Sequence, residues 1–474
     1  MAKELPKYVI IQSDDNNRYL HVDTEYPNLP NALRFEGEYS FGLETRFEVV
    51  PSTTRNGLVH IRSLLNNKYW ATSGGNSWIT AMAAKPEENQ SEKHCRLFQP
   101  VFLYSTSNSN IVARLRHVNT GNYVRRYYGN SDTGDFLGCL TLLPKMQPDD
   151  NTVDMCTFID WDSVVMLPDL IRIKFKESQS HAKAFADGYM DLRSRADNSS
   201  IYDFEVLPSR DGGIRLKSTQ FGTYWTDMQP NSWVCLTQAS PTVHETNTVF
   251  LPTTLDGNLV AMRCLKNGLF CKRYSGYGKD SCIATHHTYP DEFSYMEIEE
   301  PVFTRTISNG IYHLTDARRY DERTVALISD DQSNGTQRPQ TSQLNLKTTF
   351  TKTTNLSNST TWKGGVKVTG SFGVPKIASG SLDISVEHTR SWNWGEMVSE
   401  RTHVGSIRTV VVSPMSRVKA SLVATRCSYD IPFSYTQRDF LKNGSIKVYN
   451  KKDGLLSGTD GYDFKYDLVE LSLK

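Results

Sequence analysis

The sequence has no long apolar segment. It contains no stretch of about 18 consecutive apolar residues, which argues against a transmembrane helix. The first twenty residues also lack the apolar core of a secretory signal, because Asp14, Asp15 and Arg18 interrupt the one candidate. We therefore expect a cytoplasmic or nuclear protein that acts on membranes only when it is released or triggered.

An excess of charge of either sign is absent as well. Lysine and arginine number 53 against 52 aspartates and glutamates, a net charge of +1. This balance gives no field that would attract nucleic acid, so we expect no nucleic-acid partner. A hydrophobic content of 38% and 474 residues indicate a folded protein of about three domains.

Motifs of common catalytic sites are also missing. The sequence has no GxSxG, HExxH or P-loop motif, and no GxGxxG between a strand and a helix. Adjacent carboxylates such as Asp330 and Asp331 point to opposite faces of a strand, so they cannot flank one scissile bond. We expect neither enzymatic activity nor a cofactor.

Cysteines are few and irregularly spaced, with eight in the whole chain. A large chain does not need disulfides to stabilise its core, so we expect reduced thiols. The densest group, Cys264, Cys271 and Cys282 with His286 and His287, offers zinc-ligand atoms but no CxxC pair. We therefore predict buried or surface thiols here and no metal site.

What the sequence does contain is an internal duplication. Four residues of one segment recur 155 positions later: Tyr69 as Tyr224, Trp70 as Trp225, Asn76 as Asn231 and Trp78 as Trp233. The segment 47–51, FEVVP, recurs 157 positions later as FEVLP at 204–208. Such repetition predicts two copies of one domain.

Each copy has a shorter internal period. In the first copy Tyr19, Tyr69 and Tyr123 follow polar turns at intervals of 50 and 54 residues, and strand-like segments close at Phe47, Phe98 and Phe158. Three units of short alternating strands that share one core predict a β-trefoil, with the repeated aromatic residues mostly buried. We place the two β-trefoil domains at residues 1–163 and 168–300.

The pattern changes after residue 300, and we assign residues 302–474 to a third domain. Serine and threonine make up eleven of the twenty-one residues from 341 to 361, which favours long extended strands. Apolar side chains then alternate with polar ones over residues 366–374 and 379–387, which predicts an amphipathic hairpin. Its apolar face consists of Val366, Val368, Phe372, Val374, Ile377, Leu382, Ile384 and Val386.

This hairpin has two interpretations. Its segments have the length of membrane-spanning β-strands, about 9 to 11 residues. Because every backbone group must be paired in lipid, several chains would have to combine their hairpins in a closed barrel, which requires a homo-oligomer. An ordinary hairpin with one face in solvent gives the same alternation.

Several motifs carry a resemblance to a known family. NKYW at 67–70, SWITA at 77–81, KPEEN at 85–89 and CRLF at 95–98 resemble the agglutinin domain of amaranthin-like lectins. The resemblance covers residues 1 to about 300 as two tandem agglutinin domains. Residues 302–474 resemble the aerolysin-type pore-forming module. This resemblance rests on long strands, a Ser/Thr-rich stretch, an amphipathic hairpin and the order of the domains more than on identical residues.

The resemblance implies a lectin for galactose and N-acetylgalactosamine glycans of the T-antigen type, without metal. In that family the site lies between domains of two subunits in a head-to-tail dimer. Carried over by motif, the binding residues are Tyr69, Asn76, Ser77 and Trp78, with the duplicates Tyr224, Asn231, Ser232 and Trp233. Ser77 stands where the family has a further aromatic residue, which affects the sugar preference.

The chemistry of these loops is compatible with sugar binding, because an indole stacks on the C–H face of a sugar while Asn and Ser bind hydroxyls. The alternative is that Trp78 and Trp233 are core residues and that the asparagines only form turns.

Two functions remain open for the whole chain. The first is a lectin that targets an oligomeric pore-forming module to membranes, in plant defence. The second is a soluble nucleocytoplasmic stress lectin whose C-terminal module mediates assembly without pores.

Overall fold

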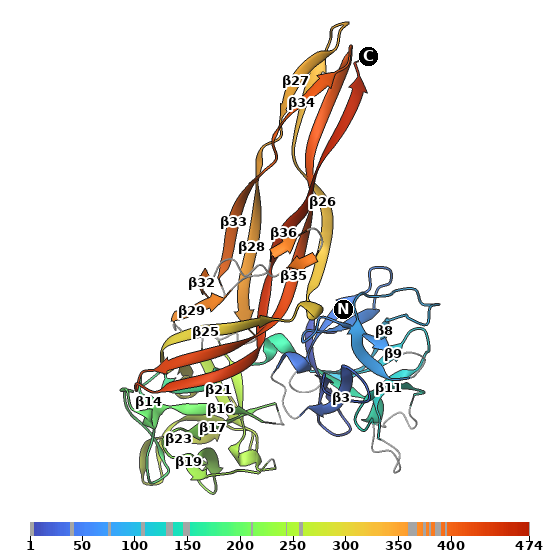
Figure 1. The fold of residues 1–474 in the computed structure, drawn as a ribbon. Helices are drawn as coiled ribbons and strands as arrows, with labels where there is room; N and C mark the ends of the chain where they lie inside the picture. The colour runs from blue at the N-terminus through green and yellow to red at the C-terminus, as the bar shows by residue number, and fades with distance from the viewer. Residues whose placement is uncertain are drawn as a thin grey trace. The chain divides into compact units, whose positions relative to one another are not determined.

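The protein is described by a computed structural model that covers residues 4–37, 42–73, 77–105, 110–128, 136–145, 152–209, 212–242, 244–255, 259–358, 367–372, 376–378, 381–383, 390–393 and 396–473. These residues form β-strands joined by turns and short 3-10 helices (Figure 1). Within these ranges no helix is long and apolar enough to cross a membrane. Internal contacts divide the chain into two compact units, which are treated separately below.

Six strands near the N-terminus pair in a closed antiparallel ring that three hairpins accompany. The ring strands are β1 (Tyr8–Ser13), β4 (Arg46–Pro51), β5 (Val59–Ser63), β8 (Phe98–Ser105), β9 (Ile111–His117) and β12 (Cys156–Asp160). The hairpins are β2 (Tyr19–Asp23) with β3 (Ala32–Gly37), β6 (Tyr69–Thr72) with β7 (Ile79–Ala83), and β10 (Tyr123–Arg126) with β11 (Leu140–Leu143). This is the topology of a β-trefoil, called here the first trefoil.

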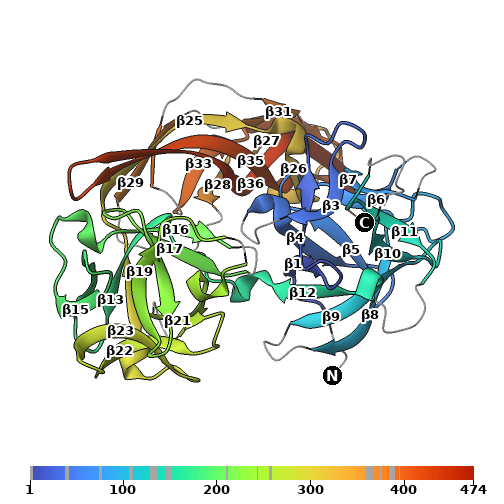
Figure 2. The same cartoon turned by 90° about the horizontal axis from the view of Figure 1, so that it is seen from below.

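The same topology recurs in the next part of the chain, the second trefoil (Figure 2). Its ring consists of β13 (Leu170–Phe175), β16 (Phe204–Pro208), β17 (Ile214–Ser218), β20 (Phe250–Thr254), β21 (Leu259–Cys264) and β24 (Met296–Glu299). Its hairpins are β14 (His181–Ala184) with β15 (Met190–Ser194), β18 (Tyr224–Met228) with β19 (Trp233–Gln238), and β22 (Phe270–Gly276) with β23 (Lys279–His287). The all-β fold with two trefoils is therefore confirmed.

Each trefoil has its own apolar core. Of the aromatic residues predicted at the repeated positions, Phe47, Phe98, Phe158, Phe204 and Phe250 are at most 1% exposed. Tyr123 and Tyr295 are only half-buried, since the neighbouring Val124 and Met296 occupy the core positions. Alternation along a strand sends adjacent side chains to opposite faces, so a shift of one residue moves a predicted core side chain outward.

All eight cysteines are buried and none forms a disulfide in the described structure. Cys264 and Cys271 lie in the core of the second trefoil, and Cys282 lies in a smaller cluster beside Trp233. Among the described residues, no three His, Cys, Asp or Glu side chains are grouped so that they could hold a metal ion.

The other compact unit is elongated and built from long strands (Figure 1). Its largest sheet contains β25 (Val302–Tyr312), β26 (Arg318–Asn334), β28 (Thr348–Asn358), β29 (Lys367–Phe372), β32 (Arg390–Asn393), β33 (Met397–Val404), β35 (Ser416–Leu441) and β36 (Ile446–Ser472). Two further strand pairs are β27 (Gln340–Asn345) with β34 (Ile407–Val412) and β30 (Lys376–Ala378) with β31 (Ser381–Asp383). The serine- and threonine-rich segment 341–361 thus contributes β27 and β28, as the sequence predicts.

The 3-10 helices are one turn each and lie between strands. They are Leu43–Thr45, Thr152–Asp154, Trp161–Ser163, Ser200–Tyr202, Thr246–Thr248, Glu292–Ser294 and Leu314–Asp316. The limits of the three predicted domains stay a prediction.

Candidate functional site

The loop predicted to bind sugar in the first trefoil holds a tryptophan that is already stacked. The ring of Trp78 lies 4.8 Å from that of Phe136 at an interplanar angle of 15°, and 4.9 Å from Tyr127 edge-on. Phe136 therefore covers one face of the half-buried indole. Exposed Ser77 uses its carbonyl oxygen to accept a hydrogen bond from the backbone N–H of Leu142 at 2.8 Å.

The two other residues predicted in this loop are Tyr69 and Asn76, and the structure shows neither of them to be accessible. Tyr69 is 4% exposed, and its ring meets the edge of His60 at 6.0 Å. Asn76 lies outside the described residues.

The duplicated loop in the second trefoil is arranged differently. Trp233 is only 4% exposed and packs against Tyr189 and Tyr274. Its burial favours the alternative interpretation of a core residue at this position. Asn231 is exposed, and Ser232 is half-buried with a positive φ of 54°.

Tyr224, also predicted at this site, is half-buried at the start of β18. The Lys217 ammonium lies 5.8 Å from the centre of its ring. An aromatic face next to a cation is thus placed on a different hairpin strand from Trp233.

Beside this loop lies a row of aromatic side chains, here called the aromatic row: Tyr274, His286, His287 and Tyr289. Tyr274 stacks on His286 with ring centres 4.5 Å apart, and His287 stacks on Tyr289 at 5.8 Å. His286 and His287 join the two stacks edge-on at 4.9 Å. Because His286 is exposed and Tyr289 is 65% exposed, the aromatic row presents ring surface to solvent.

Backbone pairing places the predicted loop against the aromatic row. Trp233 pairs with Ala284, and the N–H of Thr285 donates to the carbonyl of Ser232 at 2.8 Å. The Thr285 hydroxyl donates to the buried carboxylate of Asp227 at 2.6 Å. The backbone of Ser232 therefore lies beside Thr285, the residue before His286, so the predicted loop borders the strand that carries His286 and His287.

Charged groups fix one end of the aromatic row. Asp291 accepts hydrogen bonds from the Lys272 ammonium at 2.5 Å and the Ser294 hydroxyl at 3.0 Å. Burial opposes ionisation of Asp291, but these hydrogen bonds outweigh it and lower the pKa of the carboxyl. Its other neighbour is the ring of His287, whose Nε2 lies 3.6 Å from the carboxylate.

The environment of His286 favours its neutral form. Burial, with the nearby positive charges of His287 and Lys272, lowers the pKa of His286 below its ordinary value of 6.5. A neutral imidazole can both donate and accept a hydrogen bond, which suits a hydroxyl-rich ligand. In the sequence the histidines are visible only as candidate metal ligands, because their stacking with Tyr274 is a contact between residues of two strands, β22 and β23.

The predicted insertion hairpin is paired in a different register from the one expected. β29 pairs with β32, with Thr369 opposite Asn393, and β30 and β31 form a separate short hairpin between them. The prediction that 366–374 pairs with 379–387 is therefore wrong, because alternation fixes the face of a strand but not its partner.

The individual residues of that hairpin are only partly described. Val366, Val374, Ile384 and Val386 lie outside the described residues. Phe372, Ile377 and Leu382 lie in β29, β30 and β31. Val368 is half-buried and packs against the apolar cluster around Phe433 of the same unit, so it is not free in the conformation shown.

Comparison with known proteins identifies part of the chain. Residues 3–160 match the family model "Agglutinin domain". No curated protein matches the sequence. The match covers the part of the chain that forms the first trefoil, which is therefore similar to an agglutinin domain.

Among solved structures, the hemolytic lectin CEL-III is similar over 96% of this chain and 93% of its own, at 9% identity and a TM-score of 0.33. An aerolysin-like protein of Bombina maxima is similar over 35% of this chain and 99% of its own, at 11% identity and a TM-score of 0.25. A mosquitocidal holotoxin is similar at 9% identity and a TM-score of 0.30 over 66% of this chain, which spans only 37% of the holotoxin.

Proposed function

We propose, from the agglutinin domain at residues 3–160, that this protein is a carbohydrate-binding lectin whose elongated unit acts on membranes. The observation that carries the proposal is this domain together with a second trefoil of the same topology. Its ligands are glycans with terminal galactose or N-acetylgalactosamine, including the T-antigen, and its setting is plant defence.

The second trefoil supplies the contact surface that we favour. A sugar ring stacks its C–H face on an exposed aromatic ring, here Tyr289 or His286, while Asn231 and Ser232 bind hydroxyl groups. In the first trefoil the half-buried indole of Trp78 has only the face opposite Phe136 to offer. Two weak sites on one chain, multiplied in an oligomer, raise avidity by orders of magnitude.

The membrane step follows from the elongated unit. Chains concentrated by glycan binding combine strands of the 366–387 region into a closed barrel. A closed barrel pairs every backbone group, whereas an unpaired backbone group in lipid is energetically costly. Homo-oligomerisation is therefore part of the proposal.

Dye release from liposomes with and without a displayed T-antigen glycoprotein tests both steps. We expect release only from glycan-bearing liposomes, and loss of that release when free T-antigen disaccharide competes. Release from both kinds of liposome would contradict the lectin step. Release from neither, with disaccharide binding intact in solution, would favour the soluble nucleocytoplasmic lectin instead.

Substitutions in the aromatic row locate the glycan site. Tyr289→Ala and His286→Ala remove exposed ring surface, and each is expected to weaken disaccharide binding about tenfold, the equivalent of one aromatic contact of ~1.4 kcal/mol. Titration calorimetry measures the change. Tyr104→Ala is the matched control, because Tyr104 is 53% exposed in β8 of the first trefoil. Equal affinity in all three variants would place the site elsewhere.

A further inference from the structure

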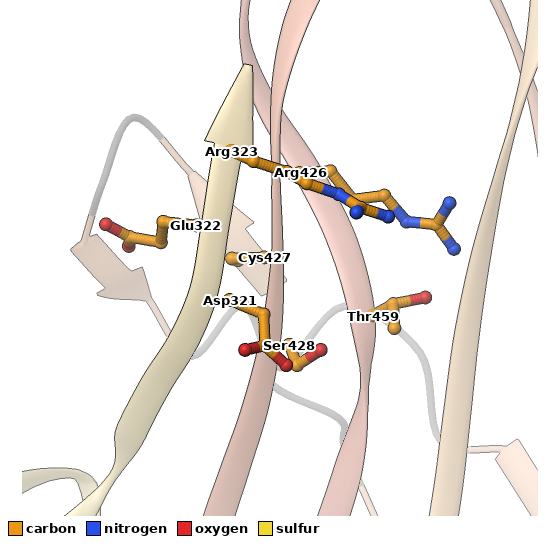
Figure 3. Close-up of a pocket in the computed structure, with 7 residues that line it drawn as sticks. All are labelled: Asp321, Glu322, Arg323, Arg426, Cys427, Ser428 and Thr459. Carbon is orange, nitrogen blue, oxygen red and sulfur yellow. The ribbon is translucent and has the colours of Figure 1, made fainter. Parts of the chain in front are cut away.

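The elongated unit contains a hollow at an irregularity in the pairing of β26 with β35. Tyr320 pairs with Ser428 and Arg323 pairs with Arg426, so β26 carries one residue more than β35 between these pairs. The extra residue produces a bulge in which Asp321 has a positive φ of 54°. The hollow has a volume of about 430 Å³ and is lined by Asp321, Glu322, Arg323, Arg426, Cys427, Ser428 and Thr459 (Figure 3).

Two arginines face each other across the strands at this point. Elsewhere on the same ladder opposite charges are paired, with Arg318 opposite Asp430 and Asp331 opposite Lys419. Like charges directly opposite on neighbouring strands destabilise a sheet. The pair Arg323 and Arg426 is therefore an exception that calls for a balancing negative charge.

Two carboxylates, Asp321 and Glu322, line the hollow, but neither forms an ion pair with Arg323 or Arg426. Glu322 is engaged by Arg319 at 3.6 Å and by the Tyr462 hydroxyl at 3.0 Å. Figure 3 shows the Glu322 side chain directed away from the two arginine side chains, which extend together to one side. No described carboxylate forms an ion pair with Arg323 or Arg426.

At the start of β35, Arg417 is an arginine whose charge is paired with a carboxylate of the neighbouring strand. Its guanidinium donates to the carboxylate of Asp331 on β26 at 2.6 Å. Both arginines of the hollow are exposed, as is Arg417 with a side-chain exposure of 45%, so burial does not explain the difference.

We propose that Arg323 and Arg426 bind a phosphate group in this hollow. A guanidinium is a planar fork that matches two oxygens of a phosphate, and two such forks on opposed strands can hold one tetrahedral oxyanion between them. The Ser428 hydroxyl, which also lines the hollow, is a further donor. The volume leaves room for a substituent, so the ligand class is a phosphate ion or a phosphate ester.

The negative charge of Asp321 is expected to weaken phosphate binding in the hollow. Its carboxylate lines the same hollow and repels an oxyanion. Replacing it by the isosteric amide, Asp321→Asn, is therefore expected to tighten phosphate binding, the opposite direction from the arginine variants.

Titration calorimetry of the full chain with inorganic phosphate, against chloride at equal ionic strength, tests the site. Arg323→Gln and Arg426→Gln are each expected to weaken binding about tenfold, the loss of one charged hydrogen-bonding group. Arg323→Lys should retain part of the affinity. Arg417→Gln is the matched control on β35 and should bind as the unaltered chain does, with far-UV circular dichroism showing that every variant folds.

A second arm distinguishes the source of the phosphate. Vesicles of phosphatidylcholine alone and of phosphatidylcholine with phosphatidic acid, neither carrying glycan, are sedimented with the protein. Binding of phosphate ion and of phosphatidic acid vesicles, both weakened by Arg426→Gln, supports the site with a lipid headgroup as its ligand. Binding of the ion alone supports the site with a soluble phosphate compound.

No binding of phosphate ion, or binding that Arg323→Gln and Arg426→Gln leave unchanged, overturns the proposal. Neither arm uses a glycan or reads membrane leakage, so the outcome is independent of the proposed function.

Discussion

Two histidines in the interior of the first trefoil have lowered pKa values. His117 is 1% exposed, and its Nε2 lies 2.9 Å from the carbonyl of Cys95. His60 is equally buried, with its Nδ1 2.9 Å from the carbonyl of Arg96. Burial lowers the pKa of both rings below 6.5, because the charged imidazolium loses its hydration there.

These two residues predict a loss of stability in mild acid. Near and below pH 6.5 the unfolded chain binds more protons on these two histidines than the folded chain does, so the free energy of unfolding falls as the pH falls. The melting temperature of the first trefoil should therefore drop between about pH 7 and about pH 5, above the range where carboxylates titrate. Differential scanning calorimetry measures it.

The double variant His60→Gln, His117→Gln is the control, and its melting temperature should depend less on pH over the same interval. A drop that persists unchanged in that variant would assign the effect to other groups.

Gly405 occupies a position in the elongated unit that no other residue fits. Its φ is +85°, and a Cβ atom there would lie 1.9 Å from the carbonyl oxygen of Leu346. Gly405→Ala should therefore lower the free energy of unfolding by more than about 2 kcal/mol, from backbone strain and displacement of β27's neighbouring turn. Chemical denaturation followed by circular dichroism measures this loss.

Gly335→Ala serves as the comparison for Gly405, because a Cβ atom at Gly335 would meet nothing within 4 Å and its φ is not positive. The prediction fails if the two alanine variants have the same stability.

At the scale of elements, the sequence identifies strands better than it identifies their partners. The positions of Phe47, Phe98 and Phe158 in the first core could be predicted because a strand shows its buried face every second residue. The register of β29 could not be predicted in this way, since the same alternation is satisfied by any partner strand on that face. Its residues pair with residues of β32 that lie 18 to 24 positions further along the chain.

The aromatic row and the predicted loop beside it illustrate the same limit. The duplication marked Asn231, Ser232 and Trp233, but it gave no reason to group them with His286 or Tyr289. The loop lies beside β23 because β19 and β23 pair, and the two strands are separated in the sequence by the whole of β20, β21 and β22. In the first trefoil, Phe136 reaches Trp78 from a segment 58 positions further along the chain.

At the scale of the whole molecule, the duplication gives two separate apolar cores with matching centres. Trp70 packs edge-on against Phe47 and Phe98, and Trp225 packs in the same way against Phe204 and Phe250. Each tryptophan is at most 1% exposed. The two trefoils should therefore lose stability separately when either centre is damaged.

Trp70→Ala and Trp225→Ala test this separation, and each serves as the control for the other. Each variant should lower the stability of its own trefoil by about 3 to 5 kcal/mol, the cost of removing a large buried aromatic side chain. Calorimetry of the full chain should then show a different transition shifted in each variant. A common transition shifted by both would mean that the trefoils unfold as one cooperative unit.

The long strands of the elongated unit also have a mechanical consequence. β35 and β36 run for 26 and 27 residues, and at ~3.3 Å per residue each spans roughly 85 to 90 Å. β35 is paired with β25, β26 and β36, and the backbone hydrogen bonds of these pairings lie across the strand direction. A pull along β35 loads these hydrogen bonds in shear and shares the force among many of them, whereas a pull across the sheet opens them one after another. The unit is therefore stiff lengthwise and can be peeled apart from its edge.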